Sequence, residues 1–187
     1  MVRLFGYQEV LSLDARGRFR LPDELSGLLF RELGRASRSA GASAAPAAYE
    51  RLAFYFVPGT RRRIFLYPTP NIDLAVRSFE QPPAGMPPEV VRQARDYFYN
   101  HMRFVDADKQ NRLLIPEALR RHAEIGEQVQ QIALVAQNYW LTLSRSELVE
   151  KEMAENLGAF EQVAADLLDP VCRPTRGFVP PEPESDR

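Results

Sequence analysis

The sequence predicts an α+β fold made of two halves with the same order of elements, and three observations lead to this prediction. A short pattern occurs twice, as Asp-Ala-Arg-Gly-Arg-Phe-Arg-Leu-Pro at residues 14–22 and as Asp-Lys-Gln-Asn-Arg-Leu-Leu-Ile-Pro at residues 108–116. An apolar run precedes each copy, and a helical pattern led by proline follows each. Hydrophobic residues make up 45% of the chain, as in an ordinary globular protein. Two such halves can build one pseudo-symmetric domain.

In the first half, strand patterns alternate with turn and helix signals. Asp14 and Gly17 bound a turn, because aspartate caps turns and glycine permits a positive φ. Residues 34–48 are rich in Ala, Ser and Gly and are predicted to be a flexible insertion. The predicted order is a strand over 9–13, a turn over 14–17, a strand over 18–21, a helix from Pro22 to Leu33, and strands over 52–57 and 64–67 joined by a basic loop over 58–63.

The second half repeats this order. Asn111 stands where the first copy has Gly17, and asparagine is the next-best residue for a left-handed conformation. The expected elements are a strand over 102–107, a turn over 108–111, a strand over 112–115, a short helix over 116–123, and strands over 132–136 and 139–143 that form a hairpin.

Further helices are expected outside the repeat. Asn71 is placed to cap a short helix through Phe79, and a linking helix follows over residues 88–100. Ser144 and Glu147 form the pattern of a capping box that opens a long helix to about Leu168. The predicted organisation is a first half over 1–80, a linking-helix segment over 81–100, a second half over 101–152, and a C-terminal helix with a Pro-rich tail over 153–187.

Composition and charge limit the class of protein. No apolar run approaches the ~20 residues of a membrane span, and the first residues lack a secretory pattern. Cys172 is the single cysteine, so no internal disulfide forms and a reducing cytoplasm is expected. The net charge of -1 argues against indiscriminate nucleic-acid binding but leaves room for a local basic face. Arginines do cluster, as Arg16, Arg18 and Arg20, as Arg61, Arg62 and Arg63, and as Arg120 and Arg121.

Taken together, these motifs resemble those of MraZ, a family of bacterial transcriptional regulators associated with the division and cell-wall gene cluster. The resemblance covers residues 3–152 and rests on Phe5-Gly6, on 13–18 with Leu21-Pro22, on Leu66-Tyr67-Pro68, and on 108–112 with Ile115-Pro116. It implies an AbrB-like swapped-hairpin barrel and a ring-shaped homo-oligomer. It also implies double-stranded DNA as the partner and a nucleoid-associated place in the cytoplasm. The tryptophan usual after the Leu-Tyr-Pro segment is absent.

In that family the Asp-x-x-x-Arg motif carries DNA contacts, and here the motif is made twice. Arginine suits the role because it makes bidentate contacts with guanine, holds phosphate oxygens and never loses its charge. The aspartates repel phosphate, so they are expected to accept turn amide hydrogens and orient the arginines. The predicted DNA-binding residues are Arg16, Arg18, Arg20, Lys109 and Arg112, with Asp14 and Asp108 in support. For Arg16, Arg20 and Lys109, the alternative is a solvated strand face.

A rival hypothesis is an oligomeric scaffold or protein-interaction module that has kept the fold and lost DNA binding. The overall acidic balance, the missing tryptophan and the acidic C-terminal helix favour it. Residues 61–63 are expected to be a solvated hairpin tip. His101 and His122 lack metal-ligand spacing, and no phosphate-binding loop or nucleophile elbow occurs. The sequence therefore predicts no enzyme, no cofactor, no metal and no small-molecule substrate.

Overall fold

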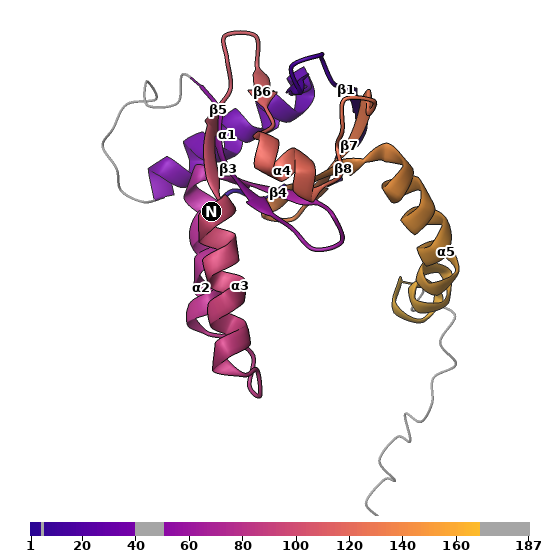
Figure 1. The fold of residues 1–187 in the computed structure, drawn as a ribbon. Coiled ribbons are helices and arrows are strands. Elements are labelled where there is room, and N and C mark those ends of the chain that lie inside the picture. Colours follow the sequence, from indigo (N-terminus) through magenta and orange to yellow (C-terminus); the bar gives the residue numbers. More distant parts are fainter. Residues whose placement is uncertain (5, 40–50, 169–187) are drawn as a thin grey trace, which may run out of the picture. The chain divides into compact units, whose positions relative to one another are not determined.

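The computed structural model describes residues 1–4, 6–39 and 51–168 and has an α+β fold (Figure 1). The chain divides into two compact units, Met1–Leu148 and Val149–Arg187, and the strands all lie in the first. The elements are β1 (Gln8–Ser12), β2 (Arg18–Arg20), α1 (Asp23–Ser39), β3 (Ala53–Pro58), β4 (Ile64–Pro68), a 3-10 turn (Thr69–Asn71), α2 (Ile72–Glu80), α3 (Pro88–His101), β5 (Arg103–Asp106), β6 (Arg112–Leu114), α4 (Glu117–His122), β7 (Gln131–Gln137), β8 (Trp140–Arg145) and α5 (Ser146–Leu168).

The two predicted halves have the expected order of strand, strand, helix, strand, strand. Pro22 and Pro116 stand directly before α1 and α4, where a missing backbone N–H costs nothing and the fixed φ favours helix. Asp23, Glu24 and Glu117 lie in the first turns of these helices, where carboxylates interact favourably with the helix dipole. The repeat in the sequence is therefore a repeat of structural elements.

The halves are interleaved by strand pairing rather than set side by side. One antiparallel sheet has the order β1-β7-β8-β4-β3-β5, and β2 and β6 form a separate two-stranded ribbon. Within each half, β3 pairs with β4 and β7 with β8. The pairs β1–β7, β3–β5, β4–β8 and β2–β6 each join one half to the other. Neither half can complete its sheet without the other.

The pairing has a pseudo-two-fold symmetry that follows the sequence repeat. Exchanging the halves turns the strand order of the large sheet into its own reverse. In the ribbon, Phe19 is directly opposite Leu113, and these two residues occupy the same position in the two copies of the pattern. The pseudo-axis therefore passes through the middle of the β2–β6 ribbon.

The large sheet is not closed into a barrel, which differs from the expected closed form. Among the described residues, β1 and β5 each have one paired neighbour and form the two edges of the sheet. The physical reason lies in the turns that follow them. After β1 and after β5 the chain reverses and its next strand, β2 or β6, joins the ribbon instead of bridging the two edges.

The inner face of the ribbon contributes to the main hydrophobic core. Phe19 and Leu113 are almost completely buried, as are Leu25 of α1 and Leu119 of α4 at equivalent positions of the repeat. Each such side chain contributes about 1.5–3 kcal/mol by leaving water. A second cluster packs α2 and α3 against β3 and β4, through Val57, Tyr67, Ala75 and Phe98. The inner face of the ribbon is thus fixed by packing against the core, and its outer face is exposed to solvent.

Three local predictions were wrong. Helix α1 continues to Ser39, so the start of the predicted insertion is helical; the remainder, from residue 40, lies outside the described residues. Asn71 makes no capping hydrogen bond and is fully buried, with its side chain bonded to the backbone of Val2 and Tyr139. Ser144 lies inside β8, paired with Ala133, and the helix begins at Ser146.

Candidate nucleic-acid interface

The β2–β6 ribbon holds three of the predicted DNA-binding residues on its outward face. Arg18 lies opposite Leu114 and Arg20 lies opposite Arg112, while Phe19 and Leu113 between them point to the core. This is the period-two alternation of a half-buried strand. The two strands come from different halves, so residues remote in sequence share one small surface.

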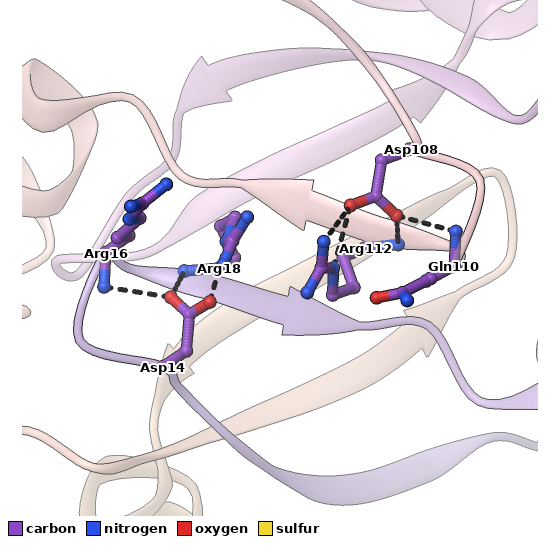
Figure 2. Close-up of polar contacts among 6 residues, drawn as sticks. All are labelled: Asp14, Arg16, Arg18, Asp108, Gln110 and Arg112. Carbon is purple, nitrogen blue, oxygen red and sulfur yellow. Dashed lines mark hydrogen bonds and ion pairs between the residues drawn. The ribbon is translucent and has the colours of Figure 1, made fainter.

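The first Asp-Arg turn is built around the carboxylate of Asp14. Its Oδ1 accepts hydrogen bonds from the backbone N–H groups of Arg16 and Arg18, each at 2.9 Å. Its Oδ2 accepts a bond from the side-chain Nε of Arg18 at 2.6 Å (Figure 2). The backbone closes the turn through Asp14 and Arg18, and Gly17 takes φ +75°. Asp14 thus folds the turn and orients Arg18, as predicted.

The second turn repeats this geometry. Oδ1 of Asp108 accepts from the backbone N–H groups of Gln110, at 2.8 Å, and Arg112, at 3.0 Å. Oδ2 accepts from Nε of Arg112 at 2.7 Å, and Nη2 of Arg112 lies at the same distance (Figure 2). Asn111 has φ +57°, the left-handed conformation that the sequence predicts for it.

Both aspartates are held in their charged form. Hydrogen bonding from the backbone N–H of Arg112, joined by its side chain, lowers the pKa of Asp108 from 3.8 to about 2. The backbone N–H of Arg18 lowers the pKa of Asp14 in the same way. At neutral pH each turn therefore pairs an ionised carboxylate with an arginine that has a fixed direction.

The arginines remain available to a ligand despite these bonds. The side chains of Arg18 and Arg112 are 27% and 33% exposed, so both reach solvent. Asp14 holds Arg18 through Nε, and guanidinium groups have further N–H donors at the terminal nitrogens. A planar donor group fixed at one edge is pre-organised for bidentate contact with a base or a phosphate.

The other predicted residues differ in how they are held. Arg16 and Lys109 are exposed on the turns, beside Asp14 and Asp108. Arg20 donates from Nη2 to both carboxylate oxygens of Asp23, at 2.9 and 3.1 Å, in an exposed ion pair. Exposed pairs of this kind contribute only about 0–1 kcal/mol, so an anion can replace the carboxylate. All three lie on or beside the ribbon that carries Arg18 and Arg112.

Arg120 is a residue of this site that the motif did not predict. It belongs to α4 of the second half, yet it packs against Gly17 of the first turn, where an ideal Cβ would lie 2.9 Å from its Nη1. Its buried Nε has no hydrogen-bond partner within the described residues. A cavity of about 120 Å³ lies here, with Arg16, Gly17 and Arg120 among its lining residues. Arg120 therefore adds a positive charge to the first turn.

The same contact explains why the two turns differ in sequence. The repeat places Ser26 of α1 where the second half has Arg120. It also places Asn111 where the first turn has Gly17. Gly17 is therefore on the turn that packs against the long side chain of Arg120. Asn111, which has a side chain, is on the turn whose equivalent helix position is the short Ser26. The sequence signal that could have identified Arg120 is the difference between the two copies of the repeat at these equivalent positions.

The basic hairpin tip between β3 and β4 is a separate feature. Arg61 and Arg62 both have positive φ, at 54° and 57°, and Arg62 Nη1 lies 2.5 Å from Glu124 Oε2. Neither residue belongs to the ribbon. The structure therefore pairs Arg62 of this tip with an acidic neighbour and not with the Asp-Arg turns.

Within the described residues, no helix is both long and apolar enough to cross a bilayer, and no cluster of His, Cys, Asp and Glu side chains is arranged to hold a metal ion. In comparisons with known proteins, no protein-family model matches the chain, and no curated protein matches it either.

Proposed function

We propose that this protein is a sequence-specific DNA-binding transcriptional regulator of the MraZ type, with the swapped-hairpin, AbrB-like fold. One observation carries the proposal. Two arginines, each anchored by its own aspartate, stand on the outward face of a two-stranded antiparallel ribbon whose centre lies on a pseudo-two-fold axis. The major groove of B-DNA is wide enough to admit such a ribbon, and arginine is the commonest reader of guanine there.

The fold assignment in this proposal rests on the interleaved pairing. Strands β2 and β6 exchange partners between the halves, and β1 and β5 pair with the opposite half as well. This exchange is the arrangement expected of swapped hairpins. It places both Asp-Arg turns on the one ribbon.

Contacts with phosphate would come from the periphery of the ribbon. Arg16 and Lys109 are exposed on the turns, Arg20 has only a weak exposed partner, and Arg120 adds charge at the first turn. Each phosphate contact formed releases counterions, so each adds about 0.9 to the slope of log affinity against log salt concentration. Several such contacts give DNA binding that weakens steeply with salt.

Self-association is part of the proposal. The edge strands β1 and β5 carry exposed apolar side chains, Val10 at 47% and Phe104 at 53% exposure. Unpaired sheet edges with apolar residues are sites of association. A ring-shaped homo-oligomer, acting at the nucleoid, would engage short repeated promoter sites at several points and gain affinity through linkage.

A scaffold or protein-interaction module is the second candidate, favoured by one feature of the site. Arg18, Arg20 and Arg112 each face a carboxylate, so part of their charge is already neutralised. Under this alternative the turns are purely structural and the apolar sheet edges carry the function.

Fluorescence anisotropy of the purified protein tests the two candidates. The probe is the DNA upstream of the protein's own gene, measured at two salt concentrations against a scrambled duplex. The proposal expects salt-sensitive binding that favours the upstream DNA and is lost in the Arg18→Ala/Arg112→Ala variant. A folded, assembled protein that binds neither duplex would favour the scaffold.

A further inference from the structure

Leu114 is an apolar side chain at one end of the basic ribbon face. It is 50% exposed, on the same face of β6 as Arg112 and directly opposite Arg18 of β2. A single exposed leucine is ordinary on a protein surface. This one is unusual because the three residues that share its face, Arg18, Arg20 and Arg112, all carry charge.

The pseudo-symmetry makes the position more informative. The residue equivalent to Leu114 in the other strand is Arg20, which forms an ion pair with Asp23 of α1. The residue equivalent to Asp23 is Glu117 of α4, which lies 3.7 Å from Arg121. One end of the ribbon therefore presents Arg112 with Arg20, and the symmetry-related end presents Arg18 with Leu114. The two ends share one arginine position and differ at the other, where a guanidinium group at one end corresponds to an isobutyl group at the other.

The major groove offers a defined partner for each end. Base edges there present hydrogen-bond donors and acceptors, which suit arginine, and the one apolar group is the C5-methyl of thymine. A leucine beside phosphates gains nothing, whereas a leucine against a methyl group removes apolar surface from water. Among the groups on duplex DNA, the thymine methyl is the one that complements Leu114.

We infer that Leu114 contacts the C5-methyl group of a thymine, and that the ribbon consequently binds its DNA element in one orientation. The Leu114 end reads an apolar group and the Arg20 end reads a hydrogen-bonding or charged group. This inference rests on the proposed function and adds the chemical group on the DNA that the ribbon recognises. It also predicts that the DNA element is not a palindrome, although the two protein strands are related by a pseudo-two-fold axis.

Replacement of thymine by uracil tests the contact, because uracil pairs in the same way and lacks only the methyl group. The probe is the shortest upstream duplex that the wild-type protein binds, with each thymine replaced in turn at the equivalent place of every repeat. We expect one thymine per element, on one side of its centre, at which replacement weakens binding about fourfold, the factor that corresponds to burial of one methyl group. The Leu114→Ala variant should bind thymine and uracil versions equally.

Val90→Ala provides the matched control, since Val90 is similarly exposed but lies on α3, outside the ribbon and outside the edge strands β1 and β5. This variant should keep the full sensitivity to uracil. Wild-type binding that ignores every replacement, or sensitivity that persists in Leu114→Ala, would overturn the methyl contact and leave the proposed function standing. If light scattering shows that Leu114→Ala changes the assembly state, Leu114 lies in a contact between copies of this chain and the methyl contact is overturned. Absence of salt-sensitive binding by the wild type would overturn both proposals.

Discussion

The contact between Gly17 and Arg120 gives a prediction about stability that does not depend on DNA. Gly17 is buried on the first turn with φ +75°, and a Cβ at this position would lie 2.9 Å from Nη1 and 3.1 Å from Cδ of Arg120. Gly17→Ala therefore introduces two separate costs. One is the left-handed backbone of an L-residue, and the other is displacement of the Arg120 guanidinium.

The two costs can be worked out separately. The left-handed conformation costs about 1–2 kcal/mol for alanine. Arg120 is contacted near the end of a flexible side chain, so it can move, and an off-rotamer side chain costs about 0.5–1.5 kcal/mol. The expected loss of unfolding free energy in Gly17→Ala is thus about 1.5–3.5 kcal/mol. Gly85 is the matched control, because its φ is +89° and nothing lies within 4 Å of an added Cβ, so Gly85→Ala should show the backbone cost alone.

Urea unfolding followed by circular dichroism measures both variants, at one protein concentration because assembly contributes to apparent stability. Arg120→Ser, which copies the equivalent residue Ser26, should restore about 1 kcal/mol to Gly17→Ala and leave Gly85→Ala unchanged. Equal losses in the two glycine variants, or no recovery with Arg120→Ser, would refute the argument that Arg120 requires glycine on this turn.

Three further predictions concern the site and its support. Arg18→Ala and Arg112→Ala should each weaken DNA binding by about 1–3 kcal/mol in anisotropy titrations while circular dichroism and assembly stay unchanged, and Arg62→Ala should have a smaller effect. Unfolding of either of the first two variants would instead make that arginine structural. The folded pKa of Asp108 lies below its ordinary 3.8, so its hydrogen bonds stabilise the fold above about pH 4 and this stabilisation is lost as the pH falls toward 2. Asp108→Asn should therefore show a smaller loss of stability than the wild type between pH 6 and pH 2 in urea titrations, and an identical acid profile would contradict this. Asn71→Ala should lower the unfolding free energy by about 3 kcal/mol or more, because two buried backbone groups of Val2 and the partly buried carbonyl of Tyr139 lose their partners. A loss below about 1 kcal/mol would mean that water replaces the amide.

The order of elements could be predicted from the sequence because it depends on local signals. Proline before a helix, aspartate and glycine or asparagine in a turn, and short apolar strands all act within a few residues. These signals occur in both copies of the repeat, so each copy supports the other. The geometry of the Asp-Arg turns was predictable for the same reason, since every bond to Asp14 comes from the four residues that follow it.

Strand partners and long-range contacts could not be predicted in this way. Nothing local indicates that β2 pairs with β6, or that Arg120 reaches Gly17. Asn71 and Ser144 were misassigned because a polar residue before a helix suggests a cap, whereas tertiary structure placed both in buried positions. The helix that continues past Gly34 shows the converse, since a segment of weak apolar character is still helical.

The interleaved pairing also sets the order of events during synthesis. Arg18 emerges from the ribosome long before its cross-strand neighbour Leu114, and β1 must wait for β7, while β3 and β4 can pair as soon as both are made. Pairing between distant segments is slow because the intervening chain must first be ordered. The ribbon face consequently appears late, once most of the chain has been translated, and a product that ends before β6 lacks it. Such a product cannot present the two turns together.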